Sequence, residues 1–451
     1  MFLSGYKRVV QLTGADCFVL ALSHMMRVNG QQGLVGQTHV VMDGIPDNAA
    51  LVAGARRLGE AYPLLNAFVR RSPFTLLPNW WVDPRDRRTL NVQIWHEVGA
   101  ESLPEGSRPA ASAQHLAEDL LNTAIEECGG LRNLRLDIVR LKDGGSSLFL
   151  TWNHLLFDGK GAELLVGSLF DAVNGRTPEP FQPVKKENIP LRTQFTESRP
   201  AVNRFFELMM NRYQSLSGKK PTPGRLRFRV INFTADESTQ IRARAEQFSG
   251  LFPLSFYLAS ATRAHREAFL SRGEDPEHYV SSIPVQLRRK WVGANPFQNR
   301  VTVLFFSMKR EHLSSMEDAV KSAHLQFEEL TRKNLGASFS MILRLMRRLP
   351  SYLYMKFLGT QFSGDITSFF HSATGSFAVN LRELAGSPVR DAYHVPSVSA
   401  PPGSGLFFGE SHGRITATFS WREGAVTEHE ADLVLGRMKE DLTGQTALGT
   451  Q

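Results

Sequence analysis

A histidine followed four and five residues later by aspartate and glycine is the combination in this sequence best suited to chemistry. It lies in the stretch NHLLFDG, residues 153–159. A neutral imidazole titrates close to working pH, so His154 can take a proton from a reacting group as a general base. Asp158 and Gly159 can equally form only a helix cap and a turn, because aspartate is a favoured N-cap and glycine tolerates left-handed geometry. The residues by themselves leave both interpretations open.

The flanking segments predict how this histidine is held. Residues 134–141 alternate apolar and polar side chains, an Asp-Gly-Gly turn follows at 143–145, and residues 148–152 form a mostly apolar run, which together are typical of a β-hairpin. Leucines and a valine then recur at helical spacing between Gly159 and Val173, before an Asn-Gly pair ends the pattern. We therefore expect His154 at the end of a strand, in a strand-to-helix turn.

The stretch resembles the HHxxxDG signature of the acyltransferase superfamily with the chloramphenicol acetyltransferase fold. This superfamily includes condensation domains of nonribosomal peptide synthetases, wax ester synthase-like proteins and plant alcohol acyltransferases. The resemblance implies that His154, which matches the second histidine, is the catalytic base and that Asp158 and Gly159 are structural. Asn153 replaces the first histidine of the signature. The resemblance implies that the residue at this position helps to position the substrate.

A second passage similar to the wax ester synthase-like branch follows later in the chain. The segment PVQLR, residues 284–288, precedes an Asn-Arg pair at 299–300, as in the "PVxLR…GN" pair of that branch. The resemblance implies an ion pair between Arg288 and Asp158 that ties two halves of the protein together. The alternative is that Arg288 belongs to a solvated basic turn.

A third passage, residues 375–380, falls where that branch has a serine–asparagine strand facing the substrate tunnel. Ala378 and Val379 occupy the neighbourhood in which the serine is expected. Ser376 and Asn380 are therefore the candidate substrate-positioning residues here.

Composition narrows the classes of function. The 451 residues are 42% hydrophobic and 21% charged, as in an ordinary globular protein with room for two domains. No apolar run approaches the ~18 residues of a membrane span, and the first residues lack a signal-peptide pattern, so we expect a cytoplasmic protein. Cys17 and Cys128 are too few for a disulfide framework and lie in no zinc-type spacing, so we expect no metal.

The net charge of +8 suits several partners. Nucleic acid is disfavoured because the basic residues are scattered and no nucleic-acid module accompanies them. The resemblance implies that the cationic surface meets the phosphates of coenzyme A or an acidic acyl carrier protein; a solvated surface without a partner stays open. Residues 341–359 mix arginines with apolar residues, so this helix either packs on the core or makes peripheral contact with a membrane.

The expected fold class is α/β (mixed α+β). The resemblance implies two chloramphenicol acetyltransferase-like lobes with a substrate tunnel between them and His154 at its middle. Residues 1–175 form the N-terminal lobe carrying the HxxxDG motif, the proline- and lysine-rich residues 176–200 a linker, and residues 201–451 the C-terminal lobe. Other patterns predict helices at 47–61, 114–127, 201–216, 236–248, 254–270 and 428–442, strands at 279–287 and 300–308, and a hairpin at 406–421.

The resemblance implies an ester- or amide-forming acyltransferase. His154 would act as the general base in a ternary complex, while an acyl group moves from a thioester donor to the hydroxyl or amine of a small acceptor. Acyl-CoA or a phosphopantetheinyl carrier would be a co-substrate, with no permanently bound cofactor. The alternatives are a free-standing condensation enzyme using carrier-bound substrates, a catalytically idle homologue that binds a carrier or partner, and lipid-surface binding through the helix near residue 350.

Overall fold

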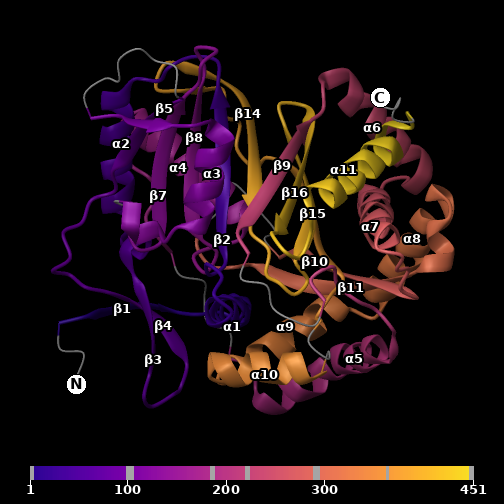
Figure 1. Ribbon diagram of the computed structural model, residues 1–451. Helices are drawn as coiled ribbons and strands as arrows, with labels where there is room; N and C mark the ends of the chain where they lie inside the picture. The colour runs from indigo at the N-terminus through magenta and orange to yellow at the C-terminus, as the bar shows by residue number, and fades with distance from the viewer. Residues whose placement is uncertain are drawn as a thin grey trace.

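The protein folds into two lobes placed side by side, with the N-terminal half in one and most of the C-terminal half in the other (Figure 1). The computed structural model describes residues 5–97, 106–128, 130–182, 188–218, 224–287, 295–361 and 365–445. Helices and sheets are mixed throughout, so the expected fold class is confirmed.

The N-terminal lobe is built on a seven-stranded sheet. Its strands are, in spatial order, β13 (Glu383–Leu384), β14 (Ser387–Pro396), β2 (Val35–Met42), β8 (Ser146–Asn153), β7 (Leu134–Arg140), β5 (Val92–Glu97) and β6 (Arg108–Ala110). Helices α2 (Asn48–Ala61) and α4 (Gly159–Val173) share a core with one face of this sheet, and α3 (Ala113–Asn122) packs on the other. Because β13 and β14 come from the C-terminal half, that half contributes an edge of the N-terminal sheet.

The C-terminal lobe contains a six-stranded sheet. In spatial order its strands are β11 (Val301–Lys309), β10 (His278–Gln286), β12 (Phe369–Ser376), β15 (Ser404–Ser411), β16 (Arg414–Arg422) and β9 (Leu226–Asn232). The helices that share its main core are α6 (Ala235–Ser249), α7 (Pro253–Ser271), α8 (Met316–Arg332) and α11 (Glu428–Thr443). A smaller cluster, which includes Phe228 and Val395, packs α3 against the opposite face. The two lobes therefore share a buried contact beside β14.

A small sheet and four helices lie below both sheets in Figure 1. They are the sheet of β1 (Lys7–Gln11), β4 (Pro78–Val82) and β3 (Phe68–Arg71), and the helices α1 (Gly14–Val28), α5 (Leu191–Met210), α9 (Leu335–Met346) and α10 (Ser351–Gln361). The 3-10 turns are η1 (Pro63–Asn66), η2 (Ile125–Cys128) and η3 (Arg310–Leu313). Helix α10 packs on α1, and α9 packs on α1, α5 and β11.

The local predictions around residue 154 are confirmed. Strands β7 and β8 pair antiparallel from Leu134 opposite Trp152 to Arg140 opposite Ser146. Helix α4 begins after Asp158 and ends at Val173. The strands predicted at 279–287 and 300–308 are β10 and β11, paired antiparallel, and the closing hairpin is formed by β15 and β16.

Four predicted boundaries are wrong. The helix predicted at 114–127 ends at Asn122 and is followed by η2. The helix predicted at 201–216 is α5, which starts earlier, at Leu191, includes Pro200 and ends earlier, at Met210. Residues 341–359 form parts of two helices, since Pro350 disfavours helical geometry in the residue before it.

Three buried histidines couple the stability of this fold to pH. Burial lowers the pKa of His39 and His265 to about 3 and that of His371 to about 4. His265 stacks on Phe369 with ring centroids 4.0 Å apart, and its Nε2 is buried without a hydrogen-bond partner among the described residues. Each imidazole stays neutral in the folded protein at a pH where the unfolded chain binds a proton.

We therefore expect His265→Phe to gain stability relative to wild type as the pH falls. The wild-type residue weakens folding below its unfolded pKa of about 6.5, and phenylalanine removes that penalty while keeping the stacked ring. We compare the free energy of unfolding of the variant with that of wild type, measured by urea titration. From pH 7.5 to pH 5, the variant should gain roughly 2 kcal/mol relative to wild type. A difference independent of pH would contradict the assignment of a buried neutral imidazole.

Candidate active site

His154 stands where strand β8 ends and the turn into α4 begins. Its backbone N–H donates to the carbonyl of Leu34, at 3.0 Å, and the Leu156 N–H donates to the Asn153 carbonyl, at 2.9 Å. The imidazole lies beside the indole of Trp152, with ring centroids 5.1 Å apart. A rigid strand and a hydrogen-bonded turn therefore position the ring, as the sequence predicts.

The backbone carbonyl of His154 accepts a hydrogen bond that the sequence did not reveal. The Asn299 side-chain amide donates to the His154 carbonyl, at 3.0 Å, and also to Asp16 Oδ1, at 2.9 Å. Asp16 Oδ1 further accepts the Asn299 backbone N–H, at 2.8 Å. Asp16 is fully buried in the first turn of α1, and burial raises its pKa. The start of α1 and the segment before β11 thus clamp the turn from the opposite side.

Asp158 joins the two lobes through backbone hydrogen bonds. Its Oδ1 accepts the Gly161 N–H, at 2.8 Å, which caps α4, and its Oδ2 accepts the Arg300 N–H, also at 2.8 Å. The side chain is buried, so both bonds are shielded from water. Arg288 lies outside the described residues, and its ion pair with Asp158 stays a prediction.

Gly159 is the first residue of α4. Its φ is not positive, so a left-handed backbone is not the reason that glycine stands at this position. A methyl group built on Gly159 would lie 3.9 Å from the His394 ring. The start of α4 therefore runs close to a second histidine that no sequence motif marked.

His394 belongs to a hydrogen-bonded chain beside the His154 turn. Its Nε2 lies 3.2 Å from Glu163 Oε1, and its Nδ1 lies 3.0 Å from Thr38 Oγ1. The Trp152 indole N–H donates to the same Thr38 hydroxyl, at 3.2 Å. Glu163 also accepts from Lys160 Nζ, at 2.9 Å, within α4. Strands β14 and β2 and helix α4 thus meet at His394, beside the candidate base.

The contacts of the other predicted site residues, Asn153, Ser376 and Asn380, do not include the His154 imidazole. Asn153 makes local bonds: its Nδ2 donates to Asn133 Oδ1, at 3.2 Å, and its Oδ1 accepts the Leu155 N–H, at 3.1 Å. Ser376 is exposed at the end of β12, and its carbonyl accepts from Lys160 Nζ, at 2.5 Å. Asn380 is exposed beyond β12, so the expected serine–asparagine strand ends at Ser376. No contact of Asn153, Ser376 or Asn380 assigns it a part in binding substrate, and these roles stay predictions.

The environment of His154 favours the neutral imidazole. Partial burial lowers its pKa, and the charge of His394 works in the same direction, while Asp158 opposes both. The Nδ1 atom is buried and forms no hydrogen bond of regular geometry with the described residues. A neutral ring at working pH is the form that can accept a proton.

Solved structures with a similar fold include an acetyltransferase and condensation domains. Trichothecene 15-O-acetyltransferase TRI3 from Fusarium sporotrichioides superposes with a TM-score of 0.69, at 15% identity, over 97% of this chain and 94% of that one. The starter condensation domain of rhizomide synthetase RzmA, in complex with C8-CoA and Leu-SNAC, gives 0.64 at 13% identity over 98% and 96%. Polyketide synthase associated protein 5 from Mycobacterium tuberculosis gives 0.61 at 15% identity over 97% and 99%.

The protein has the fold of the chloramphenicol acetyltransferase-like acyltransferases and condensation domains. No protein-family model matches the sequence, and neither does any curated protein. The match of residues 153–159 to the HHxxxDG signature stays a prediction.

Within this acyltransferase-type fold, Asp158→Asn should weaken the joint between the lobes. Asparagine keeps one acceptor oxygen but presents an N–H₂ to the other backbone N–H, so one buried donor loses its partner. We expect a loss of about 1–2 kcal/mol in the free energy of unfolding, measured by urea titration. Asp171→Asn on the same helix, at a side chain that is 50% exposed, is the matched control and should change stability by less than about 0.5 kcal/mol. Equal effects of the two substitutions would contradict a joint at Asp158.

Proposed function

We propose that this protein is a thioester-dependent acyltransferase that moves an acyl group to the hydroxyl or amine of a small acceptor. The observation that carries the proposal is His154, a strand-end imidazole with a lowered pKa, clamped from both lobes on a fold shared with acyltransferases and condensation domains. Fold alone does not determine function, so the proposal depends on that histidine.

In the proposed reaction the neutral imidazole of His154 takes the proton of the acceptor as its oxygen or nitrogen attacks the thioester carbonyl. A tetrahedral intermediate forms, and its collapse breaks the carbon–sulfur bond. The leaving thiolate then accepts this proton from the imidazolium, which restores the neutral base. No covalent acyl-enzyme is required, because donor and acceptor are bound together.

The donor we propose is acyl-CoA, with a carrier-bound thioester as the alternative. A positive net charge suits both, because coenzyme A carries phosphates and carrier proteins are usually acidic. A free-standing condensation enzyme would need the carrier. A catalytically idle homologue would need neither, although its fold would still retain His154, Asp158 and Gly159.

Replacing the base should stop turnover without unfolding the protein. We expect His154→Ala to lower kcat at least ~100-fold while donor binding and the melting temperature stay near wild type, since a positioned base contributes ~10²- to 10⁴-fold. The assay is intact-mass detection of product with acyl-CoA and acyl-carrier donors against panels of alcohols and amines. If His154→Ala turns over a donor–acceptor pair as fast as wild type does, His154 is not the base.

The same panel distinguishes the donors. Turnover with acyl-CoA alone supports the proposed donor. Saturable turnover with an acyl-carrier protein, and none with the same acyl group on coenzyme A, would assign the protein to the condensation reaction. No product from any pair, with donors bound normally, would favour the idle homologue.

The pH profile should report the environment of this histidine. Burial lowers the pKa of His154, so the base stays deprotonated below the usual histidine value. We expect the acid limb of kcat/KM to have its midpoint below about pH 6.5 and activity to be lost only as the pH falls through it. An acid limb centred above pH 7 would show that the base is not held in a desolvated site.

A further inference from the structure

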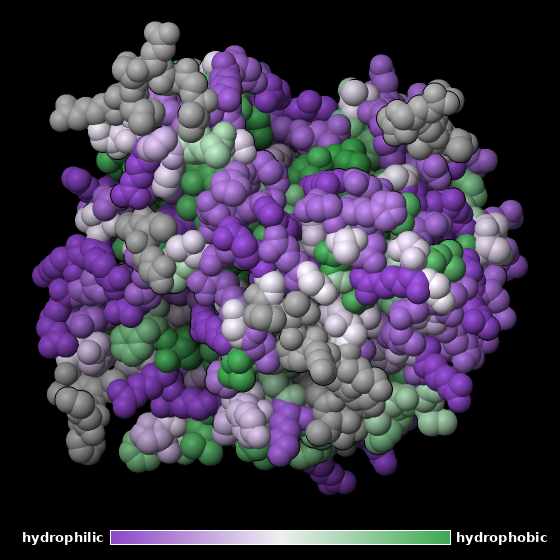
Figure 2. Space-filling view, in the orientation of Figure 1, coloured by the Kyte–Doolittle hydropathy of each residue, from purple (hydrophilic) through white to green (hydrophobic). Residues whose placement is uncertain are grey.

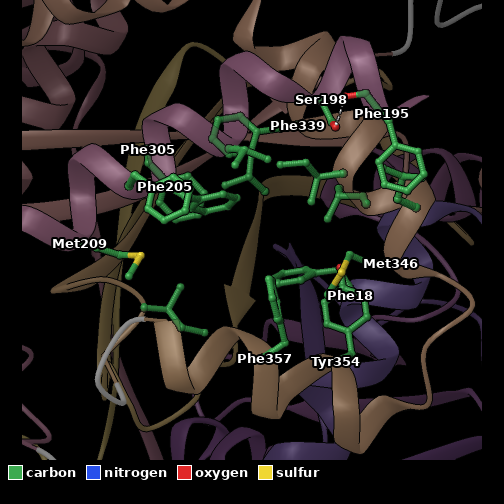
Figure 3. A pocket seen from close by; sticks show the side chains of 17 residues that line it. Phe18, Phe195, Ser198, Phe205, Met209, Phe305, Phe339, Met346, Tyr354 and Phe357 are labelled. Carbon is green, nitrogen blue, oxygen red and sulfur yellow. Dashed lines mark hydrogen bonds between the residues drawn. The ribbon is translucent and has the colours of Figure 1, made fainter. Parts of the chain in front are cut away.

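An apolar cavity of about 290 Å³ lies between helices α1, α5, α9 and α10 and strand β11. Helix α5 supplies Phe195, Phe205 and Met209 on one side and α10 supplies Tyr354 and Phe357 on the other, around a shared hollow (Figure 3). Ser198 also lines it, but the Ser198 hydroxyl already donates to the Phe195 carbonyl, at 2.8 Å. The walls therefore offer an occupant almost only hydrocarbon and aromatic surface.

The size and chemistry of this cavity select an apolar chain. An engineered apolar cavity of ~150 Å³ stays dry and binds benzene, so a cavity twice as large takes a group of roughly ten to twelve carbons. A phosphopantetheine arm carries two amides, and burying them here without partners would be costly. The occupant that fits is the hydrocarbon chain of a lipid.

The mouth of the cavity lies among exposed apolar side chains. Of the lining residues, Phe195 and Phe206 on α5 are 63% and 59% exposed, and Phe357 on α10 is 50% exposed. Leu353, elsewhere on α10, is 48% exposed. The β3–β4 hairpin, which carries the exposed Phe74, is tied to the α9–α10 connection through Arg71. Figures 1 and 2 place α5, α10 and this hairpin along the lower edge, where green apolar atoms alternate with purple polar ones.

The charges around this mouth are mostly positive. Residues 335–361, which include α9 and α10, contain Arg344, Arg347, Arg348 and Lys356 and no acidic residue. Helix α5 adds three arginines and two glutamates. Basic residues beside exposed apolar ones are the composition of a surface that binds anionic lipid. Among the described residues, no helix combines the length and apolar character that crossing a bilayer requires.

We propose that the face formed by α5, α10 and the β3–β4 hairpin docks on an anionic membrane and that the cavity draws a lipid hydrocarbon chain from it. A second copy of this chain is a poorer occupant, because a two-fold contact would place the arginines of one copy against those of the other. This inference stands on the cavity, its mouth and its charges, so it holds independently of acyl transfer at His154.

The test of docking is flotation of the full-length protein with vesicles. We expect co-flotation with vesicles of phosphatidylcholine and phosphatidylglycerol in equal parts, and weaker binding to phosphatidylcholine alone. The double variants Phe195→Ser/Phe206→Ser and Arg348→Glu/Lys356→Glu should each lower the bound fraction at least ~5-fold. Leu251→Ser, at a side chain 89% exposed between α6 and α7, and Lys439→Glu on α11 are the matched controls and should bind as wild type does.

The test of the cavity uses dodecanoic acid as the probe and native mass spectrometry as the readout. We expect one molecule to bind, and Val303→Phe or Ile342→Phe, which each fill the cavity from a different element, to lower the affinity about tenfold. Melting temperatures show whether either variant has unfolded. If one has, the affinity of the other, folded variant is the test.

His154→Ala should float and bind dodecanoic acid as wild type does, so a failure of the proposed reaction does not affect these measurements. Absence of flotation on anionic vesicles, or flotation unchanged by both double variants, would overturn the docking. A dimer that both double variants dissociate would assign the face to a second copy instead. Probe binding unchanged by both folded cavity-filling variants would overturn the hydrocarbon site.

Discussion

The structure depends on one buried corner in which Asp16, Asn299 and Asp158 hold the turn after β8. Their hydrogen bonds run from the first turn of α1 to the segment before β11 and on to the start of α4. Removing one partner would leave a buried donor or acceptor unsatisfied, which costs about 1–3 kcal/mol. The same hydrogen bonds therefore hold the lobes together and fix the backbone of His154. Because the backbone is fixed, the position of the imidazole depends on these bonds as well.

Burial serves two purposes around this corner. Withdrawing a histidine from water lowers its pKa, so the folding energy that excludes solvent also keeps His154 in its proton-accepting form. His39, His265 and His371 show the same physical effect at positions within the core, where it produces only a dependence of stability on pH. A further imidazole, that of His394, lies beside the turn and is bonded to both Glu163 and Thr38.

The surface below the sheets adds a second property to the fold. Helices α5 and α10 keep aromatic side chains in contact with water even though a core lies next to them. Such exposure is costly unless another apolar phase covers it. A membrane would cover the exposed aromatic side chains, and a lipid chain would fill the cavity.

The sequence by itself determined the β7–β8 hairpin, the turn and α4, because alternation, turn residues and a capping aspartate act within a few tens of residues. It also singled out His154 and assigned the fold class. Tertiary structure alone brought Asp16 and Asn299, 283 residues apart in the chain, to His154, and placed β14 in the N-terminal sheet. It also set His394 beside Glu163 and formed the apolar cavity. These contacts depend on how distant segments pack, and no local periodicity or capping signal encodes such packing.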